Sequence, residues 1–332
     1  ALPICIKTKI SFTLFLSLIY FSITVLNAQV KIVTGFKNGS YTEMANDIKR
    51  VAKDVIKVDT SFVKEGEFKI TETEVPFVSI KTTTGSYFNG KRLIGNINKK
   101  EKEVFFIQED VLTFIKDKSE REKGKDCTKD IRILLPLGKE EIHLIVRADS
   151  RIKSIKDLRN RTVSIGSVNQ GTNITASTIK EITGINWKSV NMSFGKAKTA
   201  LLSGNIDAFF FVGSAPVKDI ASAGTDSRFK LVPISDKKLD KHFMKSSIFA
   251  DAYKWIDADV GTYSVNVFLA TNVKTEDFED AENVRILLST IKQNIAKLQE
   301  KGHKGWKFVK FDFSKVVNWE IHEAAMKVFD LY

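Results

Sequence analysis

Cysteine is scarce in this chain of 332 residues, which contains only Cys5 and Cys127. Only Cys127 follows the apolar segment at the N-terminus, so the rest of the chain can form neither an intramolecular disulfide nor a cysteine metal cluster. None of the four histidines has the spacing of a metal ligand. We therefore expect a fold that is stabilised by packing, without a metal or any other cofactor.

Long apolar runs are also rare, and the one that occurs extends from Ile10 to Leu26. Two lysines precede it, and small and polar residues ending at Ala28 follow it. This order is typical of a secretory signal, so we predict that residues 1–28 are a signal peptide and that the protein is periplasmic. Cleavage after Ala28 would place Leu26 at the −3 position, where signal peptidases favour a small residue, so an uncleaved membrane anchor remains the alternative interpretation. The mature part has no further run of this length and is expected to be soluble.

The net charge is +12, from 52 lysines and arginines against 40 acidic residues. The lysines are scattered along the sequence and form no block. Such a balance suits anionic solutes, a nucleic acid or simply a basic proteome. The export signal disfavours nucleic acid, and we expect no nucleic-acid partner.

Apolar runs alternate with helical patterns along the mature chain, a rhythm typical of mostly parallel sheets with helices on both faces. The length favours two lobes over one. The sequence therefore predicts the α/β class. The runs are VKIVTGF, EVFFIQED, IHLIVRAD, TVSIGS and DAFFFVG, and the helical patterns cover Tyr41 to about Ile56 and Asn173 to Ile182.

The first strand leads into a loop that holds Gly35 and Gly39 and then into a helix. Ser40 and Glu43 have the spacing of a capping box, which predicts that the helix begins at Tyr41. A helix start after such a loop leaves backbone N–H groups pointing into open space, where an anion can bind. An ordinary βα turn is the alternative. The spacing is not G-x-G-x-x-G and no Walker lysine follows, so a nucleotide site has little support.

A second passage, from Val163 to Gly184, repeats this order of strand, glycine-bearing polar loop and helix. In open α/β sheets, ligands bind outside the carboxyl ends of the strands, so two small sheets facing each other would present both helix starts to one cleft. Residues 141–149 and 261–272 are candidate hinge strands. We expect residues 29–143 and 262–332 to form lobe 1 with the C-terminal helices, and residues 144–261 to form lobe 2.

Seven short motifs, in this order and spacing, resemble the TAXI solute receptors of TRAP transporters, and the resemblance covers nearly all of the mature chain. The motifs are Thr34-Gly35 with Gly39-Ser40-Tyr41, Thr83-x-Gly85-Ser86-x-x-Asn89, Phe106-Ile107-Gln108-x-Asp110, Lys156-Asp157-Leu158 with Val163-x-Ile165-Gly166, Gly171-Thr172-x-x-Thr175-Ala176, Gly204-x-Ile206-Asp207, and Gly261-Thr262-Tyr263. The resemblance implies a type II periplasmic binding protein, with two doubly wound lobes joined by crossing hinge strands.

The resemblance also implies a function. The protein would bind a small organic anion, such as a dicarboxylate or an acidic or amidic amino acid, and would deliver it as a monomer to the membrane subunits of a TRAP permease. The solute would bind between the lobes. The residues implied as its ligands are Thr34, Gly35, Ser40, Tyr41, Thr83, Gly85, Ser86, Gln108, Asp110, Gln170, Gly171, Thr172, Asn173, Phe211 and Gly213.

Three of these residues also have structural interpretations. Tyr41 could pack on the core, Asp110 could cap a helix, and Phe211 could belong wholly to a strand core. Arg147 and Lys81 are candidate counter-charges for an anion, although each could equally be solvated.

Two other functions stay open. One is a periplasmic sensor that signals to a histidine kinase. The other is a serine-type hydrolase, because Ser177 and Lys180 form S-x-x-K. That spacing recurs throughout this lysine-rich chain without its S-D-N or K-T-G companions, and no base is evident for a serine nucleophile. We therefore expect a binding protein and not an enzyme.

Overall fold

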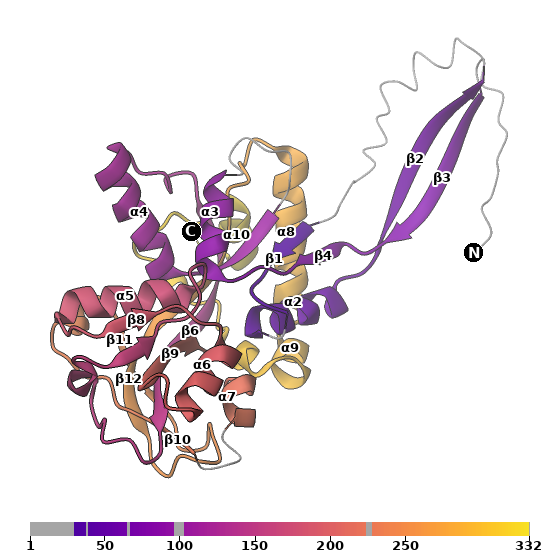
Figure 1. Cartoon of the computed structure of the whole chain (residues 1–332). Helices are drawn as coiled ribbons and strands as arrows, with labels where there is room; N and C mark the ends of the chain where they lie inside the picture. The colour runs from indigo at the N-terminus through magenta and orange to yellow at the C-terminus, as the bar shows by residue number, and fades with distance from the viewer. Residues whose placement is uncertain (1–29, 38, 65–66, 96–102, 224–227, 332) are drawn as a thin grey trace.

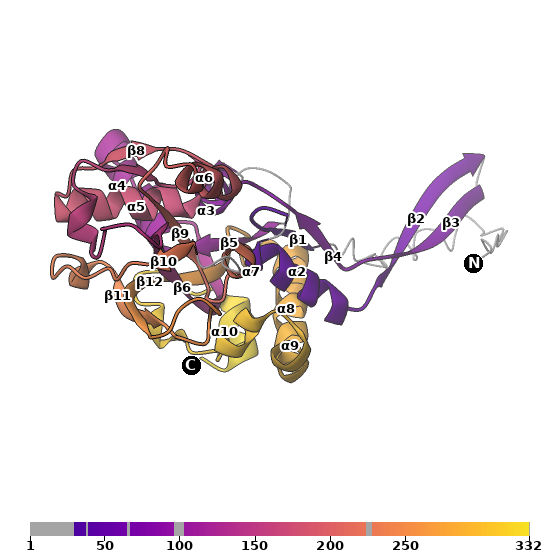
Figure 2. The ribbon, with the colours of Figure 1, turned by 60° about the horizontal axis from the view of Figure 1, so that its bottom comes forward.

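The computed structural model describes residues 30–331, except for 38, 65–66, 96–102 and 224–227. The chain forms an α/β fold around one ten-stranded sheet (Figures 1 and 2). This confirms the predicted fold class. The predicted signal peptide lies outside the described residues, and no helix within them is long and apolar enough to cross a bilayer.

The first half of the sheet is parallel. Strand β1 lies between β4 and β5 and pairs with both. Helices α2, α3 and α4 begin near the carboxyl ends of these strands, and the C-terminal helices complete the half. The bounds are β1 Val30–Val33, β4 Val78–Lys81, β5 Glu103–Gln108, α2 Ser40–Val51, α3 Ser86–Gly95, α4 Glu109–Lys123, α8 Phe278–Gln293, α9 Ile295–Lys301 and α10 Glu323–Phe329.

The second half repeats the arrangement around β7, which pairs in parallel with β8 and β9. Helix α5 begins at Gly171 and ends at Thr183. Gly184, with a φ of +69°, is its left-handed C-cap, as the sequence predicts. The remaining bounds are β7 Thr162–Ser164, β8 Lys188–Val190, β9 Ala208–Gly213, β10 Phe229–Leu231, β11 Met244–Ile248, α5 Gly171–Thr183, α6 Phe194–Leu202 and α7 Lys218–Ala223.

Two long antiparallel strands, β6 (Arg132–Arg147) and β12 (Val260–Thr271), pair with each other and connect the halves. Strand β12 also pairs with β5, and β6 also pairs with β9, so the sheet is continuous. The prediction of two separate sheets is therefore wrong. Residues 133–137 of β6 pack in the core of the first half, whereas Ile142, Leu144 and Val146 pack in that of the second. The predicted lobe boundaries fall inside these two strands.

The N-terminal part differs from the sequence prediction in two ways. Helix α2 ends at Val51 instead of about Ile56, and residues 55–64 form β2 (Val55–Lys64), which pairs with β3 (Glu67–Val75) in a hairpin that projects from the body (Figure 1). The sequence VIKVDTSFV is rich in β-branched residues, which favour strands. The predicted capping box is also absent: Gly39 is the N-cap, and no side chain caps the helix.

The C-terminal segment is clamped onto α2 by the buried carboxylate of Asp47. Asp47 accepts hydrogen bonds from the backbone N–H of His303 at 2.6 Å and from Trp306 Nε1 at 3.0 Å. It also contacts Arg50. This clamp fixes the turn that carries His303, at the start of the 3₁₀ helix Lys304–Phe308.

We expect Asp47→Ala to lower the free energy of unfolding by about 2 to 4 kcal/mol. The substitution leaves two buried N–H donors without an acceptor, at about 1 to 3 kcal/mol each. Urea unfolding measures the change, and Asp54→Ala, at an exposed position beyond the end of α2, serves as the control. Equal stabilities of the two variants would contradict the clamp.

Candidate functional site

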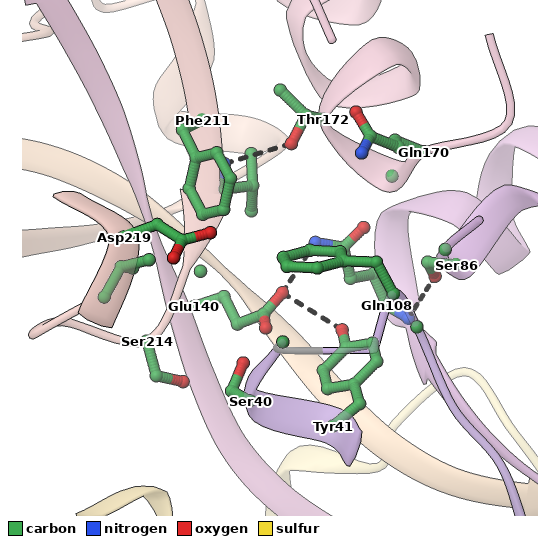
Figure 3. Close-up of a pocket in the computed structure, with 18 of the residues that line it drawn as sticks. Ser40, Tyr41, Ser86, Gln108, Glu140, Gln170, Thr172, Phe211, Ser214 and Asp219 are labelled. Atoms are coloured by element: carbon green, nitrogen blue, oxygen red, sulfur yellow. Dashed lines mark hydrogen bonds between the residues drawn. The ribbon is translucent and has the colours of Figure 1, made fainter. Parts of the chain in front are cut away.

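A hollow of about 740 Å³, part of it open to solvent, lies between the two halves. The start of α2, the loop from β4 into α3 and the end of β5 line it from the first half. The start of α5, the end of β9 and the loop into α7 line it from the second half (Figure 3). The candidate ligand residues that line it are Gly35, Ser40, Tyr41, Gly85, Ser86, Gln108, Gln170, Gly171, Thr172, Phe211 and Gly213.

The remaining four residues of the predicted set, Thr34, Thr83, Asp110 and Asn173, do not line the hollow. Thr34 is buried and shares a hydrogen bond of 2.8 Å with Thr42. The hydroxyl of Thr83 donates to Thr34 O and to Asn89 Oδ1. These threonines hold the loops that shape the first wall, so their role is to position the wall.

Asp110 connects the two halves. Its Oδ2 accepts a hydrogen bond of 2.5 Å from Thr175 Oγ1, so α4 of the first half is joined to α5 of the second. Asp110 is not the cap of α4, because the helix begins at Glu109 with Gln108 as N-cap. Burial raises the pKa of Asp110 to about 6.

Two helix starts face the hollow, one from each half. Ser40 opens α2, and Gly171 and Thr172 open α5. The backbone N–H groups of these three residues have no hydrogen-bond partner among the described residues. Free N–H groups at a helix start, together with the positive end of the helix dipole, attract an anion.

Glu140 of β6 is the central polar group of the hollow, and the sequence analysis missed it (Figure 3). Its side chain is almost entirely buried, at 4% exposure. Oε2 accepts hydrogen bonds from Tyr41 at 3.0 Å and from Gln108 Nε2 at 2.7 Å. Oε1 has no partner in the part of the chain that the structure describes, and it is not covered by neighbouring atoms.

The environment of Glu140 favours its neutral form. Burial raises its pKa to about 8, and the carboxylates of Asp110 and Glu141 add to this effect. The hydrogen bonds from Gln108 and Tyr41 oppose the shift without cancelling it. In the sequence, Lys-Glu-Glu looks like a solvated charge run, whereas in the fold Glu140 lies where the central strand crosses between the halves.

Gln108 links Glu140 to the start of α5. Its Nε2 donates to Glu140, while its Oε1 is buried without a partner and lies against Gly171. A Cβ atom at residue 171 would overlap Gln108 Oε1, so a larger residue there would displace the Gln108 amide from its place between Glu140 and α5. Tyr41 also stacks on Phe106, so it both packs on the core and lines the hollow.

Charged side chains lie at the mouth of the hollow. Glu43 of α2 is 3.5 Å from Lys218 of α7 and 3.5 Å from His303 Nε2, so it pairs across the two halves. Burial lowers the pKa of His303. Of the two predicted counter-charges, neither Lys81 nor Arg147 lines the hollow, and Arg147 pairs with Asp149 at 3.0 Å.

His143 supports the second wall from behind. Its Nδ1 bonds to Glu141 O, and its Nε2 bonds to Tyr253 Oη at 2.8 Å. The same Tyr253 oxygen accepts a hydrogen bond from Val217 N, in the loop before α7. Burial lowers the pKa of His143 to about 4, so this histidine is neutral at pH 7 and has a structural role.

The described residues contain neither a histidine–serine pair nor a cluster of metal-ligating side chains. None of their histidines forms a hydrogen bond with a serine hydroxyl. Within the same residues, no group of three or more His, Cys, Asp or Glu side chains could hold a metal ion.

We expect Glu140→Gln to gain stability relative to the wild type as the pH rises from 5 to 8. Glu140 keeps its proton up to about pH 8 when folded but ionises near 4.5 when unfolded. The folded wild type therefore loses up to about 1.4 kcal/mol per pH unit across this window, and glutamine does not titrate.

Urea unfolding of both proteins at pH 5, 6, 7 and 8 measures the difference. The titrations of Asp110 and His143 are present in both proteins, so subtracting one curve from the other isolates Glu140. Parallel stability curves would show that Glu140 is ionised in the folded protein.

Solved structures with similar architecture share little sequence with this chain. A TctC solute binding protein from Polaromonas is 14% identical over 84% of this chain and 85% of its own, with a TM-score of 0.45. The periplasmic sulfonate-binding protein SsuA from Methylobacillus flagellatus KT is 15% identical over 84% of this chain and 74% of its own, with a TM-score of 0.44. The GluR0 ligand-binding core from Nostoc punctiforme, in complex with L-glutamate, is 14% identical over 82% of this chain and 98% of its own, with a TM-score of 0.43.

A comparison with protein families also gives a match. The model of the NMT1-like family matches residues 62–330. This segment contains most of the hollow, including Glu140, Gln108 and the start of α5. The chain therefore belongs to the NMT1-like family.

Proposed function

We propose that this protein is an extracytoplasmic solute receptor. It captures a small organic anion, a dicarboxylate or an acidic or amidic amino acid, between its two lobes and delivers it as a monomer to a TRAP-type membrane permease. The observation that carries this proposal is that two helix starts, one from each half, face a single hollow. The motifs that resemble TAXI receptors support the choice of permease.

The polar groups of the hollow are sufficient for useful affinity without an arginine. A carboxylate at a helix start gains about 0.3 to 1 kcal/mol when exposed and up to about 2 when partly buried. Each hydrogen bond to a charged group contributes about 1.5 to 3 kcal/mol. Three or four such contacts, less the cost of association, reach about −8 kcal/mol, which corresponds to micromolar binding.

Contacts between the halves provide the mechanism for closure. Lys91 Nζ donates to Asn169 Oδ1 at 2.9 Å, and Thr175 donates to Asp110. A solute that touches both helix starts adds its contacts only in the closed form, so it shifts the hinge by that difference in affinity. The closed form is the one that the permease recognises.

We expect protein that lacks residues 1–28 to melt at a higher temperature with one class of dicarboxylate or amino acid and to become more compact on binding. Differential scanning fluorimetry and small-angle scattering measure the two effects. A full panel of these solutes without any thermal shift would refute the proposed function.

Gly171→Ala is expected to weaken solute binding at least tenfold, because its methyl group would displace the Gln108 amide from the hollow wall or hold α5 away from β5. Gly195→Ala is the matched control: Gly195 lies in the first turn of α6, and a Cβ atom there meets nothing within 4 Å. Titration calorimetry with the solute found in the panel compares the two variants. Equal affinities would show that binding does not require the close approach of α5.

A further inference from the structure

We propose that the solute of this cleft carries a positively charged nitrogen, which binds Glu140, beside a carboxylate, which binds the start of α5. This inference rests on the proposed function and narrows its solute class to ammonium carboxylates. Plain dicarboxylates are then the poorer ligands.

The position of Glu140 carries the argument. It is the most deeply buried charged side chain lining the hollow among the described residues, and it meets no cation there. Its Oε2 is held by Tyr41 and Gln108, whereas its Oε1 is free and open to the hollow. The carboxylate is almost entirely buried, so its ionised form is costly unless a cation reaches it, and Oε1 is the oxygen that a solute in the hollow can reach. An ammonium group is the donor that also matches its charge.

The charges around Glu140 strengthen this preference. Asp219 of α7 lines the same hollow, and Asp110 and Glu141 act on Glu140 from α4 and β6. The basic side chains that line the hollow are Lys218 and His303. Both face Glu43 at the mouth, and burial lowers the pKa of His303, which favours its neutral form. The interior is therefore acidic near Glu140, and it accommodates a cation better than a second carboxylate.

Gln108 sets the distance between the two ends of the solute. Its Nε2 donates a hydrogen bond to Glu140, and its Oε1 lies against Gly171 at the start of α5. The two binding points are therefore separated by roughly the width of one side-chain amide. An α-amino acid, whose ammonium and carboxylate groups are joined through a single carbon, has that separation.

The two solute classes differ in their exchange of protons. An ammonium group beside Oε1 favours the ionised carboxylate, so Glu140 releases its proton to the buffer when the solute binds. With a pKa of about 8 in the empty site, this release approaches one proton per solute at pH 7. A dicarboxylate instead needs Glu140 to stay protonated and donate, so its binding releases no proton.

The test is titration calorimetry at pH 7 in phosphate and in Tris, whose different ionisation enthalpies report the protons exchanged. The probes are L-glutamate, L-glutamine, L-aspartate and L-asparagine, with glutarate and succinate as acids that lack the ammonium group. We expect an amino acid to bind at least tenfold more tightly than its ammonium-free counterpart, with release of about one proton.

The Glu140→Gln substitution is expected to have opposite effects on the affinities for amino acids and for dicarboxylates. It should weaken amino acid binding at least tenfold and remove the proton release, while a dicarboxylate, which can accept from the new amide, binds equally well or better. The control is Glu181→Gln, which removes one negative charge at an exposed position of α5 outside the hollow and should leave both affinities unchanged. Thermal melting verifies that both variants fold.

Each outcome is decisive. If dicarboxylates bind as tightly as amino acids and Glu140→Gln weakens neither, the inference is overturned while the proposed function stands. If an amino acid binds without proton release, Glu140 is not its ammonium ligand. If no probe binds, the proposed function fails and the inference fails with it.

Discussion

The antiparallel pairing of β6 with β12 is the constraint on which the structure depends. Because each strand belongs to the cores of both halves, the halves share one sheet and cannot move independently. Any closing motion must bend or twist these two strands. Glu140 lies on β6 at this crossing, so the central polar group of the hollow is fixed by the element that joins the halves.

The electrostatics of the site follow from this placement. A strand at the centre of the sheet is covered on both faces, so a glutamate on it loses water, and burial raises its pKa to about 8. The helix starts of α2 and α5 provide positive potential from neutral backbone groups, whereas Asp219, together with Glu140 once a solute has displaced its proton, provides negative potential. Positive and negative potential therefore lie a short distance apart in the hollow. Such a hollow selects a solute by the arrangement of its charges more than by its net charge.

The sequence allowed much of the fold to be predicted because many of its signals are local. Gly184 ends a helix because a left-handed residue is needed there, and Phe209 to Phe211 form a strand because the run is apolar and short. The loop before α5 likewise predicted a helix, although its start was predicted at Asn173 and the helix begins at Gly171.

The errors arise where longer-range contacts decide the outcome. Ser40 and Glu43 have the spacing of a capping box, but Glu43 instead turns toward Lys218 and His303, which are distant in sequence. Thr34 and Thr83 were predicted as ligands, whereas their hydroxyls bond to Thr42 of α2 and Asn89 of α3 and do not line the hollow. Glu140 was missed because its burial depends on which strands flank it, and a single sequence does not show that.

The most direct test of the account is a crystal structure of the protein with a solute bound. The account predicts that one solute spans the hollow, with its carboxylate on the backbone N–H groups of Gly171 and Thr172 and its nitrogen within hydrogen-bond distance of Glu140 Oε1. A solute bound to only one half, or one that places a carboxylate against Glu140, would contradict it.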